Sequence, residues 1–92
     1  MSTIRIPPVL REETGGSRTV EVRAATVAEA LDELFARHPE LRQRVTQEGG
    51  ELSPFINVYV NDRDVRYRDG LATEIGPDDT VILLPAMAGG AR

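Results

Sequence analysis

Cysteine and lysine are both missing from this chain of 92 residues. The lack of cysteine excludes disulfides, thiol nucleophiles, side-chain persulfides and thiolate ligands for an iron–sulfur cluster. All eleven basic residues are arginine, a bias that is typical of a GC-rich genome. The single histidine, His38, has no partner residues of the usual kind for a metal site or a catalytic triad, so we expect it to cap the end of a helix.

Long apolar runs are missing too, and no segment approaches the roughly 20 apolar residues of a membrane-spanning helix. The first six residues include Arg5 but no apolar signal core, so we expect a cytoplasmic protein. The net charge is −4 and no basic block is present, which argues against a nucleic-acid partner. Apolar residues make up 40% of the chain, enough for one domain with one core, and we expect a monomer when the protein is free.

Alternating apolar and polar residues predict two strands early in the chain, at residues 3–6 and 18–24. The Gly15-Gly16 pair lies between them, so the two strands are expected to form a hairpin. Pro7 and Pro8 predict that the first strand ends at a sheet edge or in an irregular exit.

A capping box at Thr26 and Glu29 predicts the start of the main helix. We expect the Thr26 hydroxyl to accept from the Glu29 amide, and the Glu29 carboxylate to reach back to the Thr26 amide. One buried stripe follows at helical spacing: Val27, Ala30, Leu31, Leu34 and Phe35. Pro39 ends this helix and opens a short second turn, with Leu41 and Val45 facing inward.

The second half of the chain contains the strongest strand pattern, at residues 55–60, with Ile56, Val58 and Val60 on one side. A turn at Asn61-Asp62 and a short returning strand at residues 64–68 follow. After a second turn at residues 76–79, the continuously apolar residues 81–84 predict a strand covered on most sides in the middle of the sheet. We therefore expect an α+β fold of the β-grasp (ubiquitin-like) kind, in which a mixed sheet of four to five strands packs on one main helix.

The last glycine pair, Gly89-Gly90, differs from the pairs at residues 15–16 and 49–50, which lie in connecting loops. It follows a buried strand and nearly ends the chain. Such a slim tail can enter a narrow channel, and from Pro85 to Gly90 it spans up to roughly 20 Å. A backbone carboxylate becomes reactive once adenylation supplies a leaving group, and sulfide then converts it to a thiocarboxylate, which stores sulfur without any cysteine. The lack of lysine has a second interpretation here, because an activated terminus gains from having no side-chain amines nearby.

Three stretches together resemble the MoaD/ThiS family of ubiquitin-like sulfur carriers: Ile56–Asp62, Gly76–Asp79 and Val81–Gly90. The resemblance covers essentially the whole chain, including strand order and helix position. The long first loop, Leu10–Ser17, is most similar to the CysO-like branch, which supplies sulfur for cysteine synthesis. This resemblance implies a protein co-substrate rather than an enzyme, with no catalytic residue, metal or cofactor of its own.

By this resemblance, Gly90 carries first the adenylate and then the thiocarboxylate, while Ala88 and Gly89 form the slim tail. Activation implies an E1-like, ATP-dependent adenylating and sulfurtransferase enzyme, and the sulfur then passes to a synthase similar to cysteine synthase. Three residues are expected to contribute to docking of the activating enzyme: Leu84, Pro85 and Met87. Core packing is the alternative role for Leu84.

The chain departs from the family pattern by continuing through Ala91-Arg92, which ties the carboxyl group of Gly90 into a peptide bond. We therefore divide it into a β-grasp domain with the start of a flexible tail (1–88), a Gly-Gly carrier terminus (89–90) and an extension (91–92). A zinc peptidase of the JAMM type is expected to remove the extension before activation. The alternative is that Ala91 and Arg92 were added artificially.

Other charged clusters point less clearly to a function. Glu12-Glu13 and Asp78-Asp79 lie in turns without a second converging group, so we expect solvated charge rather than a hydrolytic carboxylate pair. A local basic cluster is formed by Arg63, Arg66 and Arg68. It predicts either a solvated sheet edge that discourages aggregation or an ionic contact with the activating enzyme or the acceptor synthase.

Alternatives to cysteine synthesis stay open on the sequence alone. The sulfur acceptor can instead belong to molybdopterin, thiamine, thiosugar or other secondary-metabolite synthesis. A non-catalytic ubiquitin-like interaction module would bind through its sheet and never use its terminus. A protein tag joined to lysines, as ubiquitin is, is a further alternative.

Overall fold

The computed structural model describes residues 1–86. The predictions for the remaining site residues lie outside this range: Met87, Ala88, Gly89, Gly90, Ala91 and Arg92. Five strands form one sheet: β1 (Ser2–Arg5), β2 (Thr19–Val22), β3 (Ile56–Val60), β4 (Arg63–Asp64) and β5 (Thr80–Pro85). Their order is β2-β1-β5-β3-β4, with β1 and β5 parallel and the other neighbours antiparallel, so the sheet is mixed.

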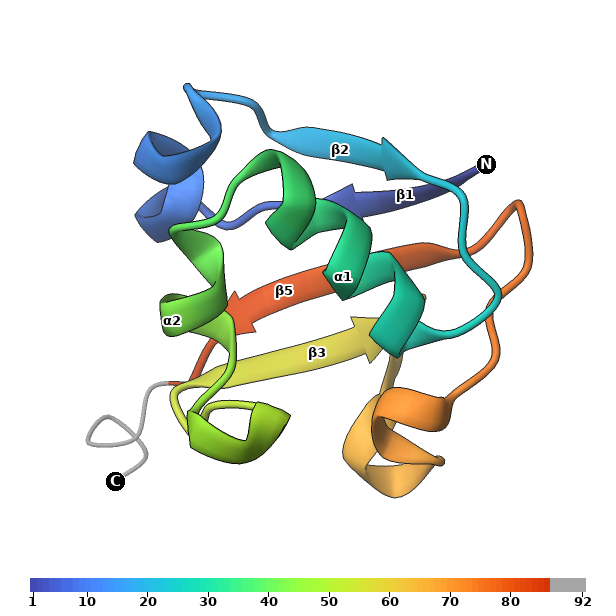
Figure 1. The fold of residues 1–92 in the computed structure, drawn as a ribbon. Coiled ribbons are helices and arrows are strands. Elements are labelled where there is room, and N and C mark those ends of the chain that lie inside the picture. Colours follow the sequence, from blue (N-terminus) through green and yellow to red (C-terminus); the bar gives the residue numbers. More distant parts are fainter. Residues whose placement is uncertain (87–92) are drawn as a thin grey trace.

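One main helix, α1 (Val27–Arg37), lies across one face of this sheet, and the short α2 (Leu41–Val45) follows it (Figure 1). The connections contain four short 3₁₀ helices: η1 (Pro8–Thr14), η2 (Glu48–Gly50), η3 (Val65–Tyr67) and η4 (Gly70–Ala72). This is the β-grasp roll that the strand and helix patterns predicted, and the expected mixed sheet on one main helix is confirmed.

The hydrophobic core includes α1 and the covered face of the sheet. The predicted helical stripe is buried at every position, as are the inward residues of β3 and the two inward residues of α2. Ile4 of β1 and Val81 and Leu83 of β5 complete the strand side of the core. Since full burial of one such side chain contributes about 1.5–3 kcal/mol, these periodic positions decide which face of each element turns inward.

The start of α1 differs in one detail from the predicted capping box. The Thr26 hydroxyl accepts from the Glu29 amide at 3.2 Å, as expected. The Glu29 carboxylate instead accepts from the Ala25 amide, at 2.8 Å, so the predicted return bond to Thr26 is wrong by one residue. The effect on the helix is the same, because a carboxylate in the first turn still accepts a hydrogen bond from a backbone amide near the helix N-terminus.

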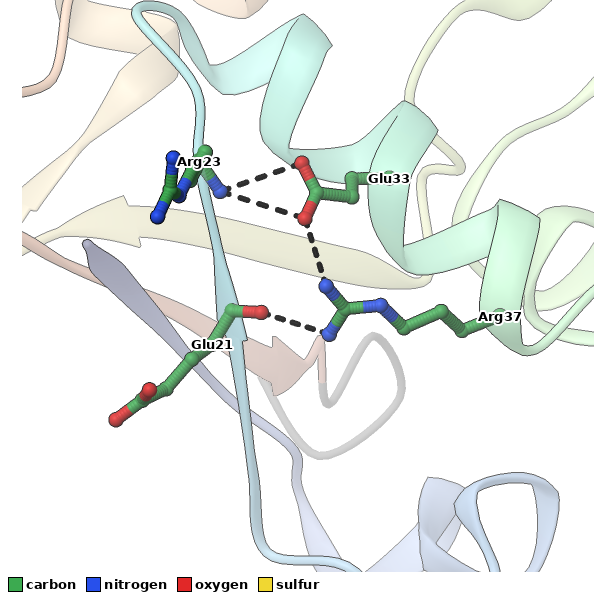
Figure 2. Close-up of polar contacts among 4 residues, drawn as sticks. All are labelled: Glu21, Arg23, Glu33 and Arg37. Atoms are coloured by element: carbon green, nitrogen blue, oxygen red, sulfur yellow. Dashed lines mark hydrogen bonds and ion pairs between the residues drawn. The ribbon is translucent and has the colours of Figure 1, made fainter.

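Side chains of α1 cover the free edge of β2 (Figure 2). Pairing of β2 with β1 leaves the Glu21 carbonyl and the Arg23 amide facing outward. The Arg37 guanidinium donates to the Glu21 carbonyl at 2.7 Å, and the Glu33 carboxylate accepts from the Arg23 amide at 3.2 Å. Arg37 also donates to Glu33 at 2.7 Å. The helix therefore occupies backbone groups that would otherwise offer this edge to another strand.

The end of the first strand is an irregular exit and not a sheet edge, because β2 and β5 flank β1 on both sides. Pro7 lies beyond the strand, where its missing amide costs no bond of the ladder. Pro8 opens η1 as its first residue, and Gly15 ends that helix with a φ of 65°, a conformation that glycine adopts without strain.

Two further strand predictions need correction. The returning strand expected at residues 64–68 is limited to Arg63–Asp64, because the Asp64 carboxylate accepts from the Arg66 amide at 2.8 Å and caps η3. β5 is central as predicted, but it is covered on one face only: Ile82 is half-buried and Leu84 is 43% exposed. The uncovered face becomes relevant at the C-terminal end of β5.

Candidate functional site at the end of β5

β5 carries the chain to the point where the predicted carrier tail begins. Leu84 and Pro85 still pair with β3, and the Ala86 amide donates to the Phe55 carbonyl at 2.8 Å, which extends the pairing past the strand. The chain is therefore held against the sheet as far as Ala86. We call Ala86, the last residue held in this way, the root of the tail. An extended chain from Ala86 to Gly90 spans about 13 Å, so this anchored root limits how far a Gly90 carboxyl group can lie from the domain.

Arg66 braces the part of β3 against which this root is held. Its guanidinium donates to the Asn57 side-chain oxygen at 2.5 Å, to the Ile56 carbonyl at 3.0 Å and to the Ser53 carbonyl at 3.2 Å. A planar guanidinium with five donors suits such a multiple contact. One member of the predicted basic cluster therefore has an internal structural role. A contact of the cluster with a partner protein stays a prediction.

Apolar side chains are exposed around the root. Leu84 is 43% exposed, which excludes the core-packing alternative, and Pro85 is half-buried. Phe55, which was not among the predicted docking residues, is 65% exposed. The sequence contained a signal for this exposure: neighbouring residues of an extended chain face opposite sides, so Phe55 faces away from the side on which Ile56 is buried. Leu84 faces the uncovered side of the sheet, whereas Pro85 pairs with the buried Ile56 and is in phase with the covered side. A docking role for Leu84 and Pro85 stays a prediction.

Asp79 lies just before β5, at the end opposite the tail root, and its role there is structural. Its carboxylate accepts from the Gly76 amide at 2.7 Å and from the Asn61 side-chain amide at 3.0 Å. The bond from Gly76 first, and that from Asn61 second, hold the pKa of Asp79 below its usual value of 3.8, with a smaller contribution from Arg68. Asp78 is exposed as predicted, while Asp79 is partly buried and has a structural role as well, because it organises the turn that leads into β5.

The other predicted clusters do not converge on a reactive site. Glu13 forms an ion pair with Arg44 at 3.2 Å, and Glu12 is exposed. His38 lies at the end of α1 as predicted, where its backbone amide donates to the Leu34 carbonyl at 2.9 Å. Within residues 1–86, no three His, Cys, Asp or Glu side chains are grouped so that they could hold a metal ion. No helix in that part of the chain is long and apolar enough to cross a membrane.

Comparisons with known proteins agree with this architecture. The model of the ThiS family matches residues 4–90. The sulfur carrier protein CysO of Mycobacterium tuberculosis is 41% identical over 90 residues, which cover 96% of this chain and 97% of that protein. A chain in the crystal structure of the BexX/CysO complex of Amycolatopsis orientalis superposes with a TM-score of 0.90 at 47% identity, over 98% of this chain and 100% of that one. Small archaeal modifier protein 1 of Haloferax volcanii gives a TM-score of 0.81 at 36% identity, over 97% and 98% of the two chains. The chain therefore belongs to the ThiS family, among the sulfur carrier proteins of the CysO type.

Proposed function

We propose that this chain is a protein co-substrate that carries sulfur as a thiocarboxylate on the carboxyl group of Gly90. The observation that supports this most strongly is the root at Ala86, which is held to Phe55 at the start of β3 and is followed in sequence by a slim tail that contains the Gly89-Gly90 pair. The family match supports the same position, since it ends at Gly90. The chain supplies the carboxyl group and its partners supply the catalysis.

The chemistry requires two steps on one carbonyl carbon. A carboxylate oxygen of Gly90 attacks the α-phosphorus of ATP, pyrophosphate leaves, and an acyl adenylate forms. A sulfide or persulfide sulfur then attacks the carbonyl carbon and AMP leaves, so that a C–S bond replaces the C–O bond to phosphate; with a persulfide, a reductant must also cleave the S–S bond to release the thiocarboxylate. An E1-like adenylating and sulfurtransferase enzyme would catalyse both steps, docked through Leu84, Pro85 and Met87.

Activation first requires a free carboxyl group on Gly90. We propose that a zinc peptidase of the JAMM type hydrolyses the bond between Gly90 and Ala91 and releases the dipeptide Ala91-Arg92. The chain would then consist of the β-grasp domain with the start of its tail (1–88) and the Gly-Gly terminus (89–90).

The proposed acceptor of the sulfur is a synthase similar to cysteine synthase, as for the CysO proteins that this chain resembles. The Amycolatopsis CysO forms a complex with BexX, which supports assembly of such carriers with a second protein at some stage. Synthesis of molybdopterin, thiamine, or thiosugars and other secondary metabolites is the alternative destination.

Intact mass of the protein purified from its native host tests the proposal. A species that ends at Gly90, part of it heavier by the difference between sulfur and oxygen, is the expected result. In vitro, a chain ending at Gly90 should support ATP–pyrophosphate exchange by the activating enzyme. The chain that keeps Ala91 and Arg92 is the matched control and should not.

Deletion of residues 89–92 separates the carrier from an interaction module. A carrier loses all sulfur transfer, whereas a module that binds through its sheet keeps its activity. If the native protein always ends at Arg92 under sulfur-demanding growth, the carrier proposal fails and the module takes its place.

The similarity to small archaeal modifier protein 1 supports a second candidate, conjugation of the Gly90 carboxyl group to amines of other proteins. Higher-mass conjugates that contain this chain in cell extracts, lost when residues 89–92 are deleted, would support that role. Carrier chemistry and conjugation use the same activated carboxyl group, so both can be true.

A further inference from the structure

A groove lies at the same end of the sheet as the anchored root. It has a volume of about 530 Å³ and lies between the end of β1, the start of η1 and the last residues of β5. β1 and β5 are parallel, so their C-terminal ends meet at this end of the sheet (Figure 1). Apolar side chains of Pro8, Ile82 and Leu84 line part of the groove, and Leu84 is two residues from Ala86.

The charged lining of this groove is of one sign. Among residues 1–86, Arg5, Arg11 and Arg18 line it, and no carboxylate does. Arg11 is half-buried, and its Nε donates to the Ile6 carbonyl at 3.1 Å, which holds the side chain in place. Within residues 1–86, none of these three guanidinium groups has a carboxylate partner. A chain with a net charge of −4 thus concentrates unpaired positive charge at one site beside the tail root.

We infer that this arginine groove docks an acidic segment of a partner protein, with one apolar side chain of that segment on Ile82 and Leu84. Carboxylates match guanidinium groups in charge and in planar hydrogen-bonding geometry. The net negative charge of the rest of the protein disfavours a long polyanion, which would pass over acidic surface as well. A short acidic segment meets only the local positive field. The inference rests on the proposed function in one respect, because it is the tail that brings an enzyme to this end of the carrier.

Titration of the ¹⁵N-labelled full chain with a short acidic peptide tests the inference. The probe is a blocked peptide with several glutamates around one leucine, and the control peptide has glutamine in place of glutamate. We expect saturable amide shifts at the groove with the acidic peptide, weakened by salt because Arg5 and Arg18 are exposed, and no such shifts with the control.

Two charge reversals at residues that flank β2 provide a matched pair. Arg18 precedes β2 and lines the groove, whereas Arg23 follows the same strand at its other end and is also exposed. We expect Arg18→Glu to weaken binding roughly three- to tenfold, since it replaces an attraction by a repulsion, and Arg23→Glu to leave it within about twofold. Arg18→Gln is the milder variant if Arg18→Glu lowers stability.

Six results would overturn the inference. Shifts remote from the groove or equal binding of the glutamine peptide would remove the charge argument, and equal losses in the two reversals would reduce it to net charge. Equally strong binding of an oligothymidine at matched charge would make the groove a general polyanion site. Peptide binding that appears only after deletion of residues 87–92 would assign the groove to the chain's own tail. Amide shifts at the groove that depend on protein concentration alone would assign it to a second copy of the chain. The titration measures peptide binding at the groove and does not involve the thiocarboxylate. A negative titration therefore rejects the groove inference alone, and a negative mass measurement rejects the proposed function.

Discussion

Replacement of Arg66 by alanine is expected to loosen the root of the tail and to destabilise the fold moderately. The change removes three hydrogen bonds, to Asn57, Ile56 and Ser53. Hydrogen bonds from a charged donor contribute about 1.5–3 kcal/mol each when they are protected. Arg66 is exposed, so water replaces much of that interaction. We therefore expect the free energy of unfolding to fall by about 1–2 kcal/mol in total, and Tm to fall by about 5–10 °C for a domain of this size.

Urea and thermal denaturation measure this loss, with Arg63→Ala as the control. Arg63 belongs to the same basic cluster and is exposed, but its side chain has no hydrogen-bond partner within residues 1–86. Hydrogen exchange adds a local readout: the Ala86 amide should exchange faster in Arg66→Ala, because its acceptor, the Phe55 carbonyl, lies in the segment that Arg66 holds. Equal stability losses in the two variants, or unchanged exchange at Ala86, would refute the bracing role.

Three other predictions follow from the described structure. Glu33→Gln should lower the free energy of unfolding by about 1 kcal/mol in urea denaturation, because it weakens the hydrogen bonds by which α1 covers the free edge of β2. The control Glu40→Gln, at an exposed helix cap, should be neutral, and a neutral Glu33 variant would contradict the role of Glu33 at the β2 edge. The pKa of Asp79 is lower in the folded state, so its carboxylate contributes stability that is present above its ordinary value of 3.8 and is lost as pH falls through the lowered pKa. Asp79→Asn should therefore be less stable than the parent at neutral pH, and the difference should shrink at pH values well below 3.8; a difference that is constant with pH would argue against the effect. Leu83→Ala should lower the free energy of unfolding by about 2–5 kcal/mol, because Leu83 is 1% exposed. Leu84→Glu should change stability little and weaken binding to an activating enzyme, and full retention of that binding would remove Leu84 from the docking surface.

Local patterns were sufficient for most of the fold. The helical stripe of α1 and the alternation in β3 follow from burial at periods of 3.6 and 2, which depend only on near neighbours in the chain. Where a side chain had a choice of nearby partners, prediction was less accurate: Glu29 bonded to Ala25 in place of Thr26, and Asp64 capped η3 and shortened β4. The first difference is a choice by one carboxylate between two neighbouring amides, and the second is a side-chain hydrogen bond that competes with regular backbone pairing.

The candidate site divides in the same way. The sequence by itself determined that a central apolar strand is followed by a slim Gly-Gly tail, and that Leu84 and Pro85 lie at its start, because strand phase and chain order need no distant contact. Only the tertiary structure decided that β1 lies beside β5, that Arg66 braces the tail root, and that Arg5, Arg11 and Arg18 line one groove with β5. The β1–β5 pairing and the groove join segments from opposite ends of the chain, and the Arg66 side chain reaches back past a turn to β3 and the residues before it. Their energy comes from burial and hydrogen bonds that exist only once the sheet has closed, so no local sequence pattern records them.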